Sequence, residues 1–239
     1  MKLDDNSPIP LYYQLEDIIK KRIEDGTYKV DEKIPSERML SEELDISRMT
    51  ISKAIGNLVE EGILYRKKGM GTFVAKNKID FFPGLTGFTE IIENKGMKPS
   101  SRVISQSVII PDKHLCEKLQ ISEDEKVIFT QRLRLADDEI VNLEESYVPY
   151  SLCPKLLDAD LSAESIYKLL TDEGHKPSKA EEKIQAILSD KELGKLLQIN
   201  LGEAVLKRRR ITWSKDKPIE YSLDYYRGDI YTMIMTINS

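Results

Sequence analysis

Two arginines in the C-terminal half of the sequence have the type and spacing to bind a small anion. Arg132 and Arg134 alternate with leucines in a strand-like run, so their side chains share one face, about 6.6–7 Å apart. The planar guanidinium group donates paired hydrogen bonds to phosphate or carboxylate oxygens. If residues 137–139 form a three-residue turn centred on Asp138, Glu144 lies opposite Arg132 and joins the same face. The pattern therefore predicts a charged surface with two cations and a carboxylate.

A second alternating run near the C-terminus could extend this charged surface. One of its faces presents carboxylates and hydroxyls, at Glu220, Ser222, Asp224 and Tyr226. The apolar residues of the strand that carries Glu144 should point to the opposite face, at Val141, Leu143 and Tyr147. Arginines, carboxylates and a tyrosine together could line a polar, concave ligand site. The residues alone leave open the alternative that they form an exposed sheet face crossed by salt bridges.

The rest of the sequence offers little for catalysis or metal binding. His114 and His175 are isolated, and no second ligand stands at a spacing that would complete a metal site. The sequence has no nucleophile motif and no Walker-type phosphate loop, so we expect no enzyme activity, metal or cofactor. Cys116 and Cys153 are interpreted as reduced thiols. The basic run 207–210 should alternate between two faces and is interpreted as a solvated or interface strand.

The order of elements in residues 36–74 is typical of a module that binds DNA. Ser36 can cap one helix, and after a short turn Ser47 can cap a second helix that ends at Gly62. The inward stripe of the second helix consists of Ile51, Ile55, Leu58 and Val59. Two short strands then flank a basic, glycine-rich tip at 67–71. This order predicts a winged helix-turn-helix, which places its second helix in the DNA major groove.

The C-terminal half alternates strand-like and helix-like patterns. We expect helices at 85–96, 112–120, 163–173 and 190–197, the first of them capped by Thr86. We expect strands at 102–110, 126–135, 140–148, 180–189, 204–213, 219–227 and 231–237. Strands joined by hairpins, with helices between some of them, are typical of an antiparallel α+β sheet.

Length and charge fit a two-domain protein. With 239 residues, we expect a DNA-binding domain at 1–75, a linker at 76–82 and a second domain at 83–239. The net charge of −5 belongs to the part after residue 78, while the bases of the first part gather at the hairpin tip. No apolar run of about 18 residues is present and the N-terminus does not resemble a signal peptide, so we expect a cytoplasmic protein without a membrane partner.

The first part resembles the GntR family of bacterial transcription regulators. The matching segments are 10–28, 34–55 and the GMGTFV hairpin at 69–74, and the resemblance covers residues 7–75. It implies that double-stranded operator DNA lies against Ser36, Arg38, Ser47, Arg48, Thr50, Ser52, Lys53, Lys67, Gly69, Gly71 and Thr72. Ser52 stands where the family usually has an arginine, the commonest bidentate reader of guanine, so the operator sequence does not carry over. Lys53 could compensate in part for the missing arginine, but it lies about 100° further round the helix.

The second part resembles the UTRA effector domain of the HutC branch of the same family. The matching segments are 85–90, 132–149, 164–170 and 218–232. The resemblance implies an antiparallel sheet with flanking helices, similar to chorismate lyase, and a dimer. In the amino-sugar regulators of this branch, which respond to effectors such as N-acetylglucosamine 6-phosphate, a sugar phosphate is held in this domain.

Carried over by resemblance, the effector site has three parts. Arg132 and Arg134 would hold the phosphate with Ser165 and Tyr167. Backbone amides of Phe88 and Thr89 would contact an anionic or polar group. Sugar hydroxyls would be bound by Glu144, Glu220 and Tyr226.

The sequence thus predicts a dimeric transcription factor, a repressor of carbohydrate uptake or catabolism genes that a small phosphorylated sugar releases from its operator. One alternative is the same regulator with an organic-acid effector. Others are an enzyme of chorismate-lyase type and an architectural DNA-binding protein without an effector. The sequence does not identify the sugar, the operator or the regulated genes.

Overall fold

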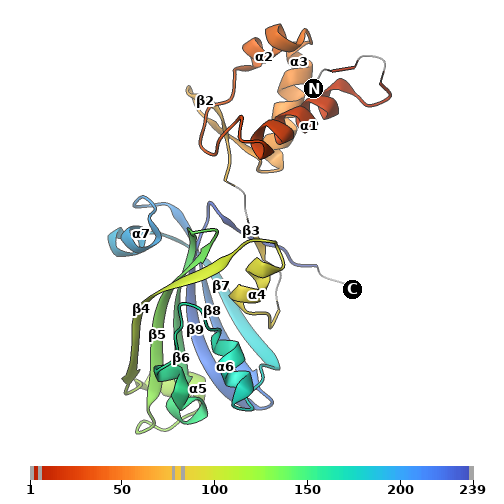
Figure 1. Cartoon of the computed structure of the whole chain (residues 1–239). Helices are drawn as coiled ribbons and strands as arrows, with labels where there is room; N and C mark the ends of the chain where they lie inside the picture. The colour runs from red at the N-terminus through yellow and green to blue at the C-terminus, as the bar shows by residue number, and fades with distance from the viewer. Residues whose placement is uncertain (1–2, 5–6, 77–78, 82–83, 237–239) are drawn as a thin grey trace. The chain divides into compact units, whose positions relative to one another are not determined.

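The chain folds into two compact units that divide between residues 78 and 79 (Figure 1). The structure, a computed structural model, describes residues 3–4, 7–76, 79–81 and 84–236. Each unit has its own hydrophobic core and is described by itself.

The first unit contains the two predicted helices and the predicted hairpin in the expected order, preceded by a further helix. They are α1 (Leu11–Glu24), α2 (Glu37–Leu44), α3 (Arg48–Glu60), β1 (Leu64–Lys67) and β2 (Gly71–Val74). Ser36 Oγ accepts a hydrogen bond from the N–H of Met39 at 3.3 Å. Ser47 Oγ accepts one from the N–H of Thr50 at 3.2 Å, so both predicted helix caps are confirmed. Gly62, just after α3, adopts the expected left-handed conformation with φ of 74°.

Apolar side chains from all five elements fill the core of the first unit. They include Leu15, Ile19, Leu40, Ile51, Ile55, Leu58, Leu64 and Val74. The stripe predicted for the second helix is buried as expected, except that Val59 at its edge is only partly buried. Burying one such side chain contributes about 1.5–3 kcal/mol, whereas a helix cap contributes about 1 kcal/mol. Packing therefore fixes α3 more strongly than its cap does.

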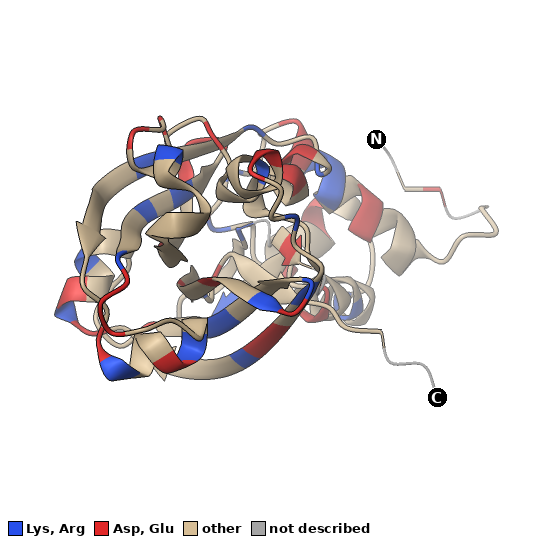
Figure 2. Ribbon diagram, turned by 90° about the horizontal axis from the view of Figure 1, so that it is seen from below, with Lys and Arg blue, Asp and Glu red and all other residues tan. Residues whose placement is uncertain are grey.

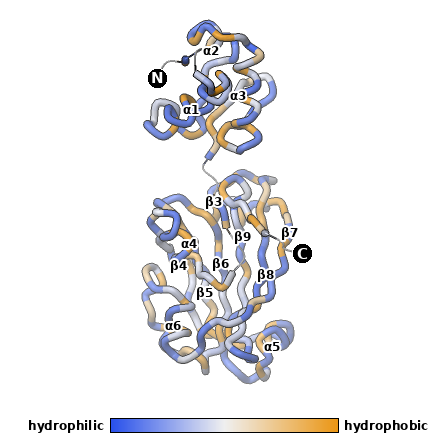
Figure 3. Tube along the Cα trace, turned by 90° about the vertical axis from the view of Figure 1, so that its right-hand side faces the viewer, coloured by the Kyte–Doolittle hydropathy of each residue, from blue (hydrophilic) through white to orange (hydrophobic). Residues whose placement is uncertain are grey.

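The second unit is built on a six-stranded antiparallel sheet, which confirms the predicted α+β class. In spatial order its strands are β4 (Pro99–Ile109), β5 (Val127–Ala136), β6 (Glu139–Pro149), β9 (Lys217–Arg227), β8 (Ala204–Ser214) and β7 (Lys179–Leu188). A separate parallel pair joins β3 (Ile79–Phe81) to β10 (Tyr231–Met233). β8 carries the hydrophilic run 207–210 in the interior of the sheet (Figure 3).

Helices pack on both faces of this sheet. They are α4 (Phe88–Glu93), α5 (Lys113–Leu119), α6 (Ile166–Asp172) and α7 (Lys191–Leu197), with 3-10 turns at Tyr150–Leu152 and Pro154–Leu157. α4 and α6 cover the face that bears Arg132 and Arg134, which we call the inner face. α5 and α7 pack on the opposite, outer face, towards its two ends (Figure 1).

The hairpin between β5 and β6 has the predicted pairing of Arg132 with Glu144 but a different turn. Asp137 and Asp138 form a two-residue turn with φ of 47° and 67°, so the expected three-residue turn is wrong. Two positive φ values give the turn a twist that matches the flanking strands. A bulge in the ladder then shifts the register by one residue, and Arg132 pairs with Glu144 as predicted.

The bulge also corrects one predicted side-chain direction. Val141 was expected on the outer face, but it packs with Tyr226 in the cluster beneath α4. An extra residue in one strand interrupts the alternation, so the residue at the bulge can turn to the other side. Leu143 and Tyr147, beyond the bulge, lie on the outer face as predicted.

Two predicted boundaries move for local reasons. Thr86 does not cap α4, because the first helical hydrogen bond runs from the N–H of Ile91 to the carbonyl of Gly87 at 3.1 Å. The strand predicted at 231–237 ends at Met233, and residue 237 lies outside the described residues.

The structure also contains a strand in the range 76–82, which was expected to be a linker. β3 lies there because Ile79 and Phe81 are both buried and its backbone pairs with β10. The second unit thus begins at residue 79 by its contacts.

Candidate functional site

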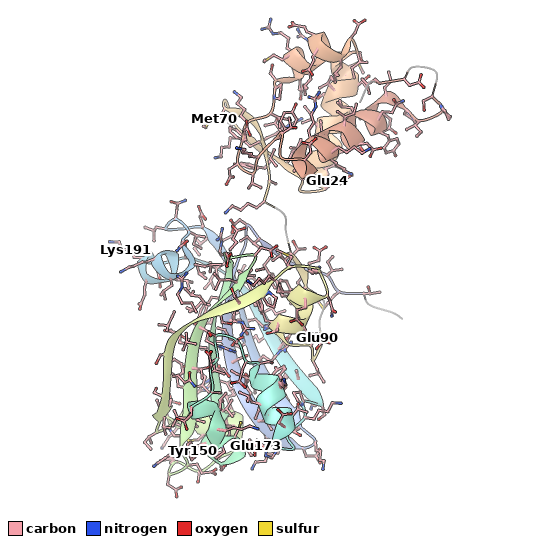
Figure 4. The ribbon with its side chains drawn as sticks, viewed as in Figure 1. Glu24, Met70, Glu90, Tyr150, Glu173 and Lys191 are labelled. Atoms are coloured by element: carbon pink, nitrogen blue, oxygen red, sulfur yellow. The ribbon has the colours of Figure 1, made fainter. Side chains whose placement is uncertain are left out.

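A cavity lies between the inner face of the sheet and helices α4 and α6. It has about 530 Å³ of space not filled by atoms, including its open mouth. Side chains of the sheet and of these helices lie between the two layers (Figure 4). Eight of the nine predicted effector residues line it: Phe88, Arg132, Arg134, Glu144, Ser165, Tyr167, Glu220 and Tyr226. Thr89, the ninth, lies outside the lining but bonds to Arg134.

Arg132 is fully engaged by the protein. It forms an ion pair with Glu144, its partner across the β5–β6 ladder, through Nε and Nη2. Its Nη1 donates to the carbonyl of Leu161 at 3.3 Å. Burial alone would raise the pKa of Glu144, but the Arg132 and Arg134 cations outweigh burial and lower it to about 2. Glu144 is therefore ionised at neutral pH and cancels much of the charge of Arg132.

Arg134 is buried but has no such partner among the described residues. Its Nη2 donates to Thr89 Oγ1 at 3.0 Å, and its guanidinium lies 4.7 Å from the centre of the Phe88 ring. Its Nε is buried without a hydrogen-bond partner among the described residues. The side chain is 4% exposed, and burial lowers its pKa to about 10, so it remains a cation at neutral pH. A buried cation with an unused donor is suited to an anionic ligand.

Ser165 and Tyr167 stand at the beginning of α6, on the far side of the cavity from the sheet. Ser165 precedes the helix, and its hydroxyl makes no capping hydrogen bond. The Tyr167 hydroxyl is already engaged, at 3.0 Å from Thr212 Oγ1 and 3.2 Å from Arg210 Nη1. Ser165 can therefore turn its hydroxyl to a phosphate without breaking a helix-capping hydrogen bond, whereas Tyr167 would have to give up one of its two contacts.

Phe88 and Thr89 begin α4, as the predicted contribution of their amides requires. The structure assigns their side chains a further role, because both contact the Arg134 guanidinium. They hold that group against α4. The amide contacts with a ligand stay a prediction.

Glu220 is a buried carboxylate held by two hydroxyls. Ser146 donates to Oε1 at 2.6 Å, and Thr212 donates to Oε2 at 3.4 Å. Burial raises the pKa of Glu220 above its ordinary value, and the neighbouring Glu144 raises it further. Tyr226, on the same face of β9, is 2% exposed and packs against Phe81 and Val141.

The raised pKa of Glu220 predicts a pH-dependent effect of Glu220→Gln on stability. An acid with a raised folded pKa contributes stability that is fully present below its unfolded pKa, near 4.5, and is lost as pH rises through the folded pKa. Glutamine stays neutral and can still accept from Ser146. The variant should match wild type at acidic pH and melt higher at pH 8, by a few °C, since about 1 kcal/mol moves Tm by ~2–4 °C in a unit of this size.

Thermal denaturation followed by circular dichroism across this pH range would measure the effect. Glu181→Gln, at an exposed position of β7, is the matched control and should show no such pH dependence. A constant difference between Glu220→Gln and wild type at all pH values would contradict a titrating Glu220.

Two arginines that the sequence interpretation placed on a solvated strand also line the cavity. The alternation predicted for 207–210 is observed, but it sends Arg208 and Arg210 into the cavity. Solvation is therefore wrong for these two residues, because β8 is an interior strand covered by α4 and α6. The register of the β8–β9 hairpin pairs Arg208 with Asp224, which the sequence already placed on the polar face of β9. That register was the sequence signal that could have placed Arg208 at the site.

The DNA-facing predictions fall on the N-terminal ends of α2 and α3. Arg38 and Arg48 are both exposed, and Arg38 lies 3.7 Å from Glu42 one turn on. Ser52 is partly exposed, whereas the Lys53 ammonium lies 3.7 Å from the centre of the Tyr12 ring on α1. Lys53 is thus directed to α1 and does not stand in for an arginine at position 52.

The remaining predictions lie in the β1–β2 hairpin. Lys67 pairs with Gly71 across the hairpin, and Thr72 is on β2. Gly69 and Gly71 have φ of 75° and 122°, a region that side-chain-bearing residues rarely adopt. They form the tip that carries Met70 (Figure 4). The tip is therefore a narrow, basic turn whose backbone can approach a phosphate closely.

The described residues contain no cluster of three or more histidine, cysteine or acidic side chains placed to hold a metal ion. No helix among them is both long enough and apolar enough to cross a membrane.

Comparison with known proteins places both units in one family. Residues 11–74 match the model of the bacterial regulatory proteins of the gntR family, and residues 94–232 match the UTRA domain. The chain is 36% identical over 237 residues to the HTH-type transcriptional repressor NagR of Bacillus subtilis, which covers 98% of this chain and 97% of NagR. It is 31% identical over 214 residues to the histidine utilization repressor of Pseudomonas putida, covering 89% and 86% of the two chains.

Solved structures show the same fold. PhnF from Mycobacterium smegmatis superposes with a TM-score of 0.76 at 22% identity, covering 96% of this chain and all of that one. The C-terminal domain of the histidine utilization repressor from Pseudomonas syringae gives a TM-score of 0.55 over 59% of this chain. The relatives are named transcriptional regulators, which gives no support to the enzyme alternative. The chain therefore belongs to the HutC branch of the GntR family, with a C-terminal UTRA domain, and is a DNA-binding transcriptional repressor.

Proposed function

We propose that this protein represses carbohydrate uptake or catabolism genes and that a small phosphorylated sugar, bound in the UTRA cavity, releases it from its operator. The observation that carries the proposal is Arg134, a buried cation with an unused donor and no described carboxylate partner. Burying an unpaired charge is costly, so the site favours an anion that would pair with it. The resemblance to regulators of amino-sugar catabolism supports a phosphorylated sugar as that anion.

In this proposal the phosphate lies between Arg134 and the Ser165 hydroxyl. Arg132 contributes less than Arg134, because Glu144 already neutralises it. Tyr167 contributes only if its hydroxyl leaves Thr212 or Arg210. The amides of Phe88 and Thr89 would approach the same phosphate from α4.

The sugar body would then extend along β6 and β9. Glu144 and Glu220 offer carboxyl oxygens to its hydroxyl groups, and Tyr226 offers the surface of its ring. Polar groups of this kind fix the orientation of a ligand and select among similar sugars.

A screen with matched ligand pairs tests the effector class. Each phosphorylated sugar is compared with its unphosphorylated parent by thermal shift and calorimetry, with organic acids as a third group. We expect binding only by members of the phosphorylated group. Binding by organic acids alone would favour the alternative effector class, since an arginine fork also fits a carboxylate.

We further propose that Arg38, Arg48, Thr50 and Ser52 face the major groove, while Lys67 and the two tip glycines contact backbone phosphates. Exposure of the arginines and the basic character of the hairpin support this division. The remaining predicted residues would support this surface or contact backbone phosphates: Ser36, Ser47, Lys53 and Thr72.

Release from the operator would follow a population shift. The effector favours an arrangement in which the two reading helices no longer match the operator half-sites. DNA binding also supports action in the cytoplasm.

A dimer is part of this proposal, and the outer face of the UTRA sheet is the surface we assign to it. The part between α5 and α7 carries Phe129, Tyr147 and Tyr221. The ring centres of Phe129 and Tyr147 lie 5.0 Å apart, and those of Tyr147 and Tyr221 lie 6.0 Å apart. All three side chains belong to the outer face. Aromatic residues are enriched in the buried centres of protein interfaces.

Replacing Phe129 by glutamate should therefore shift the full-length protein from dimer to monomer, because a charge would be buried at the interface. Sedimentation velocity at micromolar concentration measures the change. Operator affinity should fall at least tenfold, since the two half-sites are then bound independently. A wild-type protein that sediments as a monomer would contradict the half-site mechanism.

A further inference from the structure

Four charged side chains form a network at the β8 side of the cavity that the effector assignment above does not use. They are Glu182 of β7, Arg208 and Arg210 of β8, and Asp224 of β9, and we call them the β8 ion cluster. Basic and acidic positions lie side by side on the strands of this sheet (Figure 2). Arg208, Arg210 and Asp224 all line the cavity.

The cluster is internally paired. Arg208 Nη2 lies 3.0 Å from Asp224 Oδ2, and its Nη1 lies 3.4 Å from Glu182 Oε1. Arg210 Nη2 lies 2.5 Å from the same Glu182 oxygen and donates to the carbonyl of Gly84 at 2.8 Å. Asp224 Oδ1 also accepts from Asn142 at 3.1 Å. Two cations are therefore matched by two carboxylates, and the cluster as a whole is neutral.

The two ends of the cavity consequently differ in charge. At the α4 end, Arg134 has no described carboxylate partner, and Arg132 has Glu144. At the other end, the Arg208 and Arg210 guanidinium groups are both paired with carboxylates. Among the described residues, the cavity thus offers one cation without a carboxylate partner, at Arg134, beside a strongly polar region whose guanidinium groups are already paired.

We propose that the β8 ion cluster is a second subsite of the effector cavity, one that binds uncharged vicinal hydroxyl groups and excludes a second anionic group. The inference rests on the proposed function and specifies its ligand: a sugar monophosphate whose body carries unmodified hydroxyls. It assigns Glu182 as a specificity-determining residue, because Glu182 is the carboxylate that Arg210 relies on for charge balance.

The chemistry of paired ions favours hydroxyl groups over anions. A hydroxyl can accept from a guanidinium N–H and donate to the neighbouring carboxylate, so it can join the cluster without disturbing its charge. A second phosphate would meet cations that are already paired with carboxylates, and it would face the Asp224 carboxylate, which lines the cavity. Like charges in a buried site repel strongly, so this arrangement costs the second phosphate its affinity.

Calorimetry with the full-length protein tests the proposal. The ligands are glucose 6-phosphate, mannose 6-phosphate and fructose 6-phosphate, each compared with its bisphosphate, with inorganic phosphate as a reference. Wild type should bind the preferred monophosphate at least about tenfold more tightly than the corresponding bisphosphate. Glu182→Gln leaves Arg210 without a carboxylate and keeps the shape of the side chain. The variant should therefore lose most of this discrimination, mainly through tighter binding of the bisphosphate.

Glu181→Gln is the matched control, since it removes the same charge from the neighbouring, exposed position of β7. It should keep the wild-type ratio, which separates a local effect from a change in net charge. Recovery of bisphosphate binding in Glu182→Gln would also exclude size as the cause of the discrimination. The wild-type ratio tests the proposal even if Glu182→Gln does not fold.

The outcomes separate this inference from the proposed function. Equal affinity of wild type for monophosphate and bisphosphate, or an unchanged ratio in a folded Glu182→Gln, would overturn the neutral subsite while leaving the phosphate assignment intact. Failure of every phosphorylated sugar to bind wild type would overturn the proposed effector class and, with it, the subsite.

Discussion

Replacing Arg134 by alanine should weaken binding of the phosphorylated effector by about tenfold or more, because a charge-assisted hydrogen bond contributes about 1.5–3 kcal/mol. Arg134 is the cation in the cavity that the protein leaves without a described carboxylate partner, so its loss removes the charge the ligand requires. The variant should also remain on its operator at effector concentrations that release wild type. Calorimetry measures the affinity, and a mobility-shift titration measures the release.

Arg209→Ala is the control for this substitution. Arg209 neighbours the cavity arginines on β8 but points to the outer face, where it donates to Gln185. Its removal should leave effector affinity unchanged. If wild type binds a sugar and its phosphate equally, and Arg134→Ala changes neither, the phosphate assignment is wrong. Glu220→Ala should instead relax the choice between sugars, since Glu220 is assigned to hydroxyl groups.

The second large effect is expected at the DNA surface. Arg48→Ala should weaken binding to the specific operator by about 1–3 kcal/mol, the contribution of one base-reading pair. Arg48 is the first residue of α3 and is exposed, and its replacement should leave the core of the first unit intact. Fluorescence anisotropy with operator and scrambled duplexes measures the loss. Affinity for the scrambled duplex should fall much less.

Lys67→Ala provides the contrasting case. A lysine that contacts a phosphate contributes equally to all sequences, so the variant should lose affinity for both duplexes and show a salt dependence weaker by about one unit of slope. Unchanged operator affinity in Arg48→Ala would remove α3 as the reading helix. Loss confined to the operator in Lys67→Ala would contradict a phosphate contact at the hairpin.

Much of the first unit follows from sequence alone because its determinants are local. The caps at Ser36 and Ser47 act over three residues, and the buried stripe of α3 follows from helical periodicity. The left-handed glycines at 62, 69 and 71 likewise reflect the conformational freedom of single residues. The direction of Lys53 does not follow from the sequence, because Tyr12, its partner, comes from a helix distant along the chain.

In the UTRA unit, strand alternation determined that Arg132, Arg134 and Glu144 share a face, because side-chain direction alternates along any strand. Tertiary structure decided the rest. The bulge at Val141 arises because a two-residue turn is combined with a strand register that pairs Arg132 with Glu144. The burial of Arg208 and Arg210 depends on which helices cover β8. The sequence likewise left open which arginines are paired with a carboxylate. Glu144 pairs with Arg132 and Glu182 with Arg210, while among the described residues Arg134 contacts a hydroxyl and an aromatic ring. Sequence fixes which charges are present on a face, but the pairing among them depends on distances that only the packed sheet defines.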